Sequence, residues 1–152
     1  MKIKYISLLL FALAQPVLAN SSQSPEIQKS EREQVVYQYI VDLAQADYEG
    51  IAQLFDEGGI VISTSRGQAN AKEFFYSFLP QVETATTEIH QTFTSKEDPN
   101  RFAARFHLVY HLKNGDLGDG EYVDEFIFAE NSNKLAAVYM FENLKFNGSP
   151  AK

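Results

Sequence analysis

Apolar residues in the first part of the chain recur with the spacing of an α-helix. From Glu26 to Ala46 they return every three or four positions and form one stripe, made of Val35, Val36, Tyr39, Ile40 and Leu43. This spacing predicts an amphipathic helix that buries one face against the rest of the protein.

Two further helices are predicted before the pattern changes. Asp47 can cap a short helix over Tyr48–Phe55, and the pair Gly58-Gly59 is expected to end it. A third helix is predicted over Ala69–Leu79, because Pro80 follows it and cannot continue it.

After Pro80 the apolar residues recur at every second position, as they do in β-strands. A short strand at Ile60–Thr64 precedes them, and turns rich in glycine, asparagine and proline separate the later strands, which are predicted over Thr84–Ser95, Arg101–Leu112, Glu121–Phe128 and Leu135–Phe146. Three helices followed by a long meander indicate an α+β fold. We expect the three N-terminal helices to cover one face of a curved antiparallel sheet, which would enclose a pocket.

One acidic residue stands among aromatic residues on the buried face of a predicted strand. In the strand EYVDEFIF, Asp124 shares a face with Tyr122, Phe126 and Phe128, because side chains alternate between the two faces. An ionised carboxylate on an apolar face is costly, so Asp124 is predicted to be protonated, paired or solvated in a cavity.

The N-terminus has the features of a secretory signal peptide. Lys2 and Lys4 precede a short apolar run, and Val17-Leu18-Ala19 fits the small-residue rule for cleavage. We expect a signal peptide at residues 1–19, a flexible lead-in at 20–28, the folded domain at 29–147 and a tail at 148–152. The protein would be periplasmic or secreted, with an uncleaved anchor as the alternative.

Composition limits the partners and the chemistry. The chain has no cysteine, so it has no disulfide and no lipoprotein anchor. Its formal charge of −7 would become −9 after loss of Lys2 and Lys4, which argues against nucleic acid and anionic membranes as partners once the signal is removed. Motifs for metal, nucleotide and serine-hydrolase sites are absent, and no cofactor or metal site is predicted.

Several segments resemble the ketosteroid-isomerase-like and SnoaL-like proteins of the nuclear-transport-factor-two-like superfamily. The similarity runs over roughly residues 30 to 145 and rests on VVYQYIVDLAQADYEGIAQLF, on Gly67 followed by KEFFYSF, on the spacing of Asp124, Phe126 and Phe128, and on Lys134 before the last strand. The resemblance implies the conical α+β cup.

The same resemblance implies roles for individual residues. Ketosteroid isomerases use a helix tyrosine and a protonated strand aspartate as oxyanion donors, and Tyr39 and Asp124 stand at the matching positions. Their general base is an aspartate, but the matching residue here is Ser63, which cannot abstract a carbon-bound proton by itself.

Tyr39 and Asp124 are therefore the candidate catalytic residues, with roles in the packed core as the alternative. The candidate ligand-binding residues are Tyr39, Phe74, His90, Phe106, Tyr110, Tyr122, Asp124 and Phe126. His90 is included because scytalone-dehydratase-like relatives use histidines in acid–base chemistry. His107 and His111 are expected to face solvent or a partner, and their spacing on one strand is too long for a shared metal.

These features together predict an exported single-domain protein that binds a small apolar molecule and lacks ketosteroid isomerase activity. One alternative is an isomerase, cyclase or dehydratase of the SnoaL-like type acting on a polyketide- or steroid-like substrate. Another is a protein-interaction module. The strand Leu135–Phe146 is apolar on both faces, which fits either a homodimer formed through the outer face of the sheet or an interior strand of a monomer.

Overall fold

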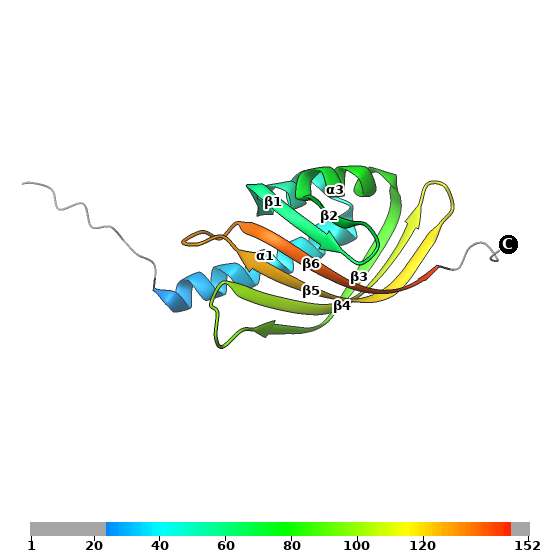
Figure 1. Cartoon of the computed structure of the whole chain (residues 1–152). Helices are drawn as coiled ribbons and strands as arrows, with labels where there is room; N and C mark the ends of the chain where they lie inside the picture. The colour runs from blue at the N-terminus through cyan, green and yellow to red at the C-terminus, as the bar shows by residue number, and fades with distance from the viewer. Residues whose placement is uncertain (1–23, 147–152) are drawn as a thin grey trace, which may run out of the picture.

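The computed structural model describes residues 24–146, which fold into three helices and one six-stranded sheet (Figure 1). The expectations for the signal peptide, for residues 20–23 and for the tail lie outside the described residues. In chain order the elements are α1 (Pro25–Gln45), α2 (Tyr48–Leu54), β1 (Phe55–Ser63), β2 (Gly67–Asn70), α3 (Ala71–Phe78), a 3-10 turn (Leu79–Gln81), β3 (Val82–Thr94), β4 (Arg101–Leu112), β5 (Leu117–Phe128) and β6 (Leu135–Phe146).

Each helix begins at a side chain that accepts a hydrogen bond from a free backbone amide. Ser24 Oγ accepts from the Ile27 amide, Asp47 Oδ1 from Gly50, and Asn70 Oδ1 from Lys72 and Glu73. Because α1 begins at Pro25, the last four residues of the expected lead-in are helical. No helix in the part of the chain that the structure describes is long and apolar enough to cross a membrane.

The sheet is mixed, which corrects the expected antiparallel arrangement. Its strand order is β2-β1-β6-β5-β4-β3, and β1 runs parallel to β6 while every other neighbouring pair is antiparallel. The pair Gly58-Gly59 lies inside β1 and does not end α2, which stops at Leu54. The short strand β2 pairs with β1 and was not predicted.

The curved sheet has two different faces, and Figure 1 shows the helices on its inner side. Along β4 and β5 the even-numbered residues are buried on this inner face, and the odd-numbered residues are more exposed on the outer face. Helix α1 packs against β3 and β4, and α3 packs against β1 and β2. The aromatic side of EYVDEFIF is therefore the buried side, as the sequence predicts.

Arg32 of α1 joins the helix to two turns at one end of the sheet. Its guanidinium donates to the carbonyl oxygens of Ser132 and Ala129 in the β5–β6 turn. It also donates to the Pro99 carbonyl and to Asn100 Oδ1 in the β3–β4 turn. Only 2% of the residue is exposed, so a charged side chain is part of the buried core at this end.

Candidate functional site

A cavity of about 250 Å³ opens between α3 and the inner face of the sheet. Most of its wall is apolar. Its charged side chains and its serine come from β6 and from the turn after β1, and two tyrosines come from β4 and β5. The lining residues are Leu43, Ser65, Arg66, Phe74, Phe75, Phe78, Leu108, Tyr110, Leu112, Tyr122, Met140 and Glu142. An apolar chamber with a few polar groups is typical of a small-molecule site.

Aromatic packing fixes the walls of this cavity. The Phe78 ring of α3 meets Tyr110 of β4 edge to face, with ring centroids 5.1 Å apart. Tyr110 lies across Gly118, its register partner on β5, and a Cβ atom at Gly118 would collide with the Tyr110 ring. The glycine thus lets the tyrosine lie flat against the neighbouring strand.

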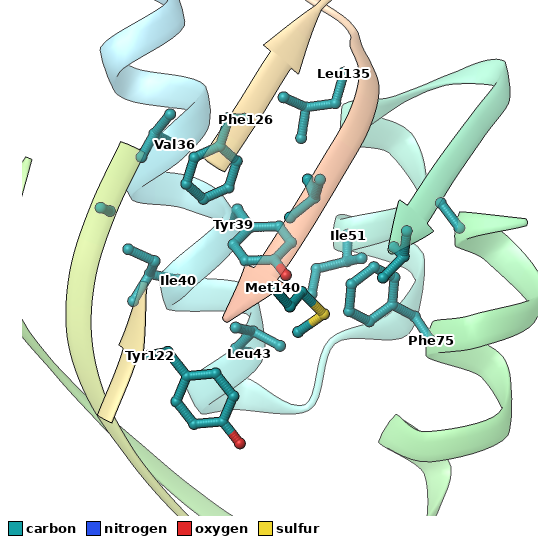
Figure 2. Close-up of a cluster of buried hydrophobic side chains, with 14 of the residues drawn as sticks. Val36, Tyr39, Ile40, Leu43, Ile51, Phe75, Tyr122, Phe126, Leu135 and Met140 are labelled. Carbon is teal, nitrogen blue, oxygen red and sulfur yellow. The ribbon is translucent and has the colours of Figure 1, made fainter. Parts of the chain in front are cut away.

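Tyr122 brings a polar atom to the apolar chamber. Its ring stacks on Phe106 with centroids 5.4 Å apart, and only 4% of the residue is exposed. No hydrogen bond to its hydroxyl is found within residues 24–143, and Figure 2 shows that hydroxyl pointing away from the other labelled core side chains. Burial raises the pKa of Tyr122 above its usual value, and the negative charge of Glu142 adds to this shift, so the hydroxyl is a neutral donor.

Glu142, Ser65 and Arg66 supply the charged and polar groups of the cavity. Ser65 Oγ donates to Glu142 Oε1 at 3.4 Å. The Arg66 guanidinium lies 5.4 Å from the centroid of the Phe74 ring and donates to Ser77 Oγ. Glu142 on β6 is the register partner of Tyr122 on β5. The cavity lining thus includes a carboxylate, a guanidinium and the two phenols of Tyr110 and Tyr122.

Tyr39 and Asp124 form a hydrogen bond, in which the Tyr39 hydroxyl donates to Asp124 Oδ2 at 3.2 Å. Both residues are fully buried. The Tyr39 ring meets Phe126 and Phe75 edge to face, and Figure 2 shows it beside Phe126. Burial raises the pKa of Asp124 well above its usual value, and although the bond from Tyr39 lowers that pKa in part, burial dominates.

This pair lies below the cavity and does not line it. Asp124 stands between Tyr122, two residues earlier on β5, and Met140, its register partner on β6, and both of these neighbours line the cavity. Asp124 Oδ1 has no hydrogen-bond partner among the described residues. The tyrosine–aspartate contact therefore supports the cavity floor from beneath.

The other predicted site residues fall into three places. Phe74, Tyr110 and Tyr122 line the cavity. Phe106 and Phe126 are buried in the core next to it. His90, which was expected to bind the ligand, does not line the cavity. It lies on the outer face of the sheet, where it contacts Glu121.

Ser63, which the sequence resemblance matches to the general base of ketosteroid isomerases, forms a hydrogen bond within a turn. It is the last residue of β1 and is 5% exposed, and its Oγ accepts a hydrogen bond from the Arg66 amide at 3.0 Å. The hydroxyl thus caps the turn that carries Ser65 and Arg66 to the cavity, and Ser63 itself does not line the cavity.

Sequence reasoning missed Ser65, Arg66 and Glu142. The alternation along β6 could have revealed Glu142, because it follows Met140 by two residues and therefore shares its face. No local pattern could have revealed Ser65 and Arg66, because the β1–β2 turn reaches the cavity only through the pairing of β1 with β6.

Comparisons with known proteins identify the fold. No protein-family profile matches the sequence, and no curated protein matches it. Among solved structures, the Δ5-3-ketosteroid isomerase of a Mycobacterium species is 14% identical, with a TM-score of 0.64 over 77% of this chain and 98% of that chain. A pinacolase from Penicillium brevicompactum is 11% identical, with a TM-score of 0.65 over 76% and 88%. A computationally designed 17-OHP binder is 13% identical, with a TM-score of 0.64 over 78% and 98%.

At these identities the likeness is one of fold. The solved structures share the α+β fold that the sequence motifs indicated, and they show the fold alone. Proteins with one fold can differ in function, so a role for this chain has to be argued from its own cavity.

Proposed function

We propose that this protein, which has the fold of the ketosteroid-isomerase-like proteins, binds a small, mostly apolar molecule with one hydrogen-bonding group. The observation that carries the proposal is the Tyr122 hydroxyl, which has no partner within the described residues and belongs to an apolar chamber. A hydrogen bond formed in apolar surroundings is stronger than one formed in water, and a ligand hydroxyl or carbonyl would form such a bond with the Tyr122 hydroxyl.

The volume of the cavity limits the size of the ligand. The chamber holds about 250 Å³. A cavity of about 150 Å³ is enough to hold benzene, whereas pockets for drug-sized ligands are usually about 300–1,000 Å³. One or two rings therefore fit inside, and a larger steroid- or polyketide-like molecule would have to extend through the opening.

Two tryptophan variants test this proposal with naphthol, a two-ring probe with one hydroxyl. Leu112 lines the cavity on β4, and Leu117 is a partly exposed leucine on the opposite face at the same end of the sheet. We expect naphthol to bind at one site in isothermal titration calorimetry. Leu112→Trp should weaken this binding at least tenfold by filling the chamber, and Leu117→Trp should leave it unchanged.

A third variant tests the polar contact. Tyr122→Phe removes only the hydroxyl, and loss of one hydrogen bond of about 1 kcal/mol corresponds to roughly a fivefold weaker affinity. The stability of the unliganded protein should change little, because the hydroxyl bonds to no described residue.

Equal weakening by Leu112→Trp and Leu117→Trp, or unchanged affinity in Leu112→Trp, would show that naphthol binds elsewhere.

One feature of the cavity favours catalysis as a second candidate function. Glu142 faces Tyr122, and a carboxylate opposite a neutral phenol is the pair that proton transfer next to a carbonyl requires. The fold serves a ketosteroid isomerase in one solved structure and a 17-OHP binder in another, so both functions are compatible with it.

Because Ser63 is not a base, we expect no measurable isomerisation of a β,γ-unsaturated cyclic ketone by the wild-type protein. The measurement is the absorbance of the conjugated product, with Glu142→Gln as the matched variant. Turnover that Glu142→Gln abolishes would establish the second candidate and end the proposal of binding without chemistry.

The proposal also includes export and self-association. The N-terminal segment supports removal of residues 1–19, and N-terminal sequencing of the exported protein should find Asn20 first and not Met1.

Two apolar side chains on the outer face of the sheet support a homodimer through that face. They are Val123 and Phe141, which are 39% and 55% exposed. Sedimentation velocity should then show a dimer, and a monomer at all concentrations would refute it.

A further inference from the structure

Two histidines and a glutamate come together on the outer face of the sheet, on the side opposite the cavity. They belong to three neighbouring strands: His90 to β3, His107 to β4 and Glu121 to β5. His107 and Glu121 are direct register partners. On β3 the register shifts between Ile89 and Gln91, so His90 is the extra residue of a β-bulge.

The bulge explains why His90 faces this cluster. A β-bulge inserts one unpaired residue and redirects its side chain. The imidazole therefore leans over β4 and reaches β5, where its Nε2 lies 3.3 Å from Glu121 Oε1. Bulges of this kind are frequent beside functional sites.

The spacing of the ligand atoms suits a metal ion. Glu121 Oε1 lies 3.3 Å from His90 Nε2 and 2.9 Å from His107 Nδ1, and the potential ligand atoms of the three residues all lie within 4.8 Å of one another. Zinc bonds to nitrogen and oxygen of about 2.0–2.1 Å give ligand–ligand separations of about 3.3 Å in a tetrahedral site. Small side-chain movements would therefore allow His90 Nε2, His107 Nδ1 and Glu121 Oε1 to bind one ion.

We propose that His90, His107 and Glu121 bind a divalent transition-metal ion such as Zn²⁺, with the fourth position open to solvent. Two imidazoles and one carboxylate form a ligand set that zinc uses in proteins, usually with water as the remaining ligand. The side chains of His90, His107 and Glu121 are 27%, 36% and 45% exposed, so an ion can enter from solution.

A second contact favours a metal site over a simple ion pair. His107 Nε2 lies 2.8 Å from Asp119 Oδ1, while the other ring nitrogen faces Glu121. An imidazole that binds a metal commonly donates its second N–H to a carboxylate, which fixes the tautomer and the orientation of the ring. Asp119 would be this positioning residue. Arg105 Nε lies 4.0 Å from Glu121 Oε2, so it contacts the carboxylate oxygen that the two histidines do not contact.

The test is calorimetric titration with Zn²⁺ of the protein purified without a polyhistidine tag and freed of metal by a chelator. We expect one saturable site. His90→Ala, His107→Ala and Glu121→Gln should each weaken it more than tenfold, and Asp119→Asn should weaken it about tenfold, as loss of an orienting partner does. His111→Ala removes the remaining histidine, which is exposed on the same face of β4, and should leave the affinity unchanged.

The visible spectrum of Co²⁺ supplies an independent readout of geometry. A tetrahedral site should give strong absorption that saturates at one equivalent and disappears in His107→Ala. Absence of saturable Zn²⁺ binding would overturn the proposal and identify the cluster as an ion-pair network. Equal loss of affinity in His111→Ala would also overturn it, because binding would then be a general property of surface histidines. Thermal unfolding of each variant checks that the fold is retained.

Discussion

Replacing Arg32 with alanine should lower the free energy of unfolding by about 3 kcal/mol, because the change leaves several acceptors in two turns without a donor. Arg32 Nη2 donates to the Ser132 carbonyl at 2.8 Å, and Nη1 donates to the Pro99 carbonyl at 3.0 Å and to Asn100 Oδ1 at 2.9 Å. The guanidinium also lies 5.0 Å from the centroid of the Phe128 ring. One side chain thus holds α1, the β3–β4 turn and the β5–β6 turn together.

Two variants control this prediction, with urea unfolding as the measurement. Arg32→Lys keeps the charge and the aliphatic stem but lacks the planar fork that reaches both turns, so it should lose roughly half as much stability. Lys29→Ala removes an exposed lysine of the same helix that pairs with Glu33, and it should cost less than about 0.5 kcal/mol. A loss in Arg32→Ala no larger than that in Lys29→Ala would show that the turns are held by other contacts.

The second large effect is the pH dependence that Asp124 gives to stability. Burial raises the pKa of Asp124 in the folded protein well above its usual value, whereas an unfolded aspartate titrates near about 3.9. The stability that this group contributes is therefore fully present below about pH 3.9 and is lost as the pH rises through the folded-state pKa. Asp124→Asn cannot ionise, so it should gain stability relative to the wild type as the pH rises over this window.

Urea unfolding of the wild type and Asp124→Asn at a series of pH values measures this effect. Asp56→Asn removes an exposed carboxylate of β1 and is the matched control, in which the pH dependence caused by Asp124 should be retained. Tyr39→Phe removes the hydrogen bond that lowers the pKa of Asp124, so the pH dependence should extend to higher pH. A constant difference between the wild type and Asp124→Asn would mean that the carboxyl does not hold a raised pKa.

Local patterns predicted the helices and most of the strands, because the periodic spacing of apolar residues in helices and strands can be recognised from residues close together in the sequence. They did not predict the parallel pairing of β1 with β6, which joins Val61 to Val138 across most of the domain. Gly58 and Gly59 lie in β1 between Phe55 and Ile60, which both pair with β6, although glycine pairs otherwise favour a helix end. Tertiary contacts therefore overrode the local signal at this point.

The site could be predicted only in part. Strand alternation predicted the buried position of Asp124, and the family resemblance singled out Tyr39 beside it as a candidate; the structure shows the two residues hydrogen-bonded. The position of the cavity above this contact depends on how α3 and the β1–β2 turn pack on the sheet, which no local pattern records. The helix pattern places Arg32 among residues expected to be exposed to solvent, but the structure buries it. His90 contacts Glu121 only because a bulge interrupts β3.

Nuclear magnetic resonance of the Met140 methyl group tests the proposed binding site most directly. Met140 lies in the cavity wall, and apart from Met1 it is the only methionine of the chain. Selective ¹³C labelling of methionine and valine methyl groups gives one probe of the chamber and, in Val123, one probe of the outer face. We expect naphthol to shift the Met140 signal with the midpoint found by calorimetry and to leave Val123 unchanged. An unchanged Met140 signal while Val123 shifts would place the ligand on the outer face and contradict the proposed function.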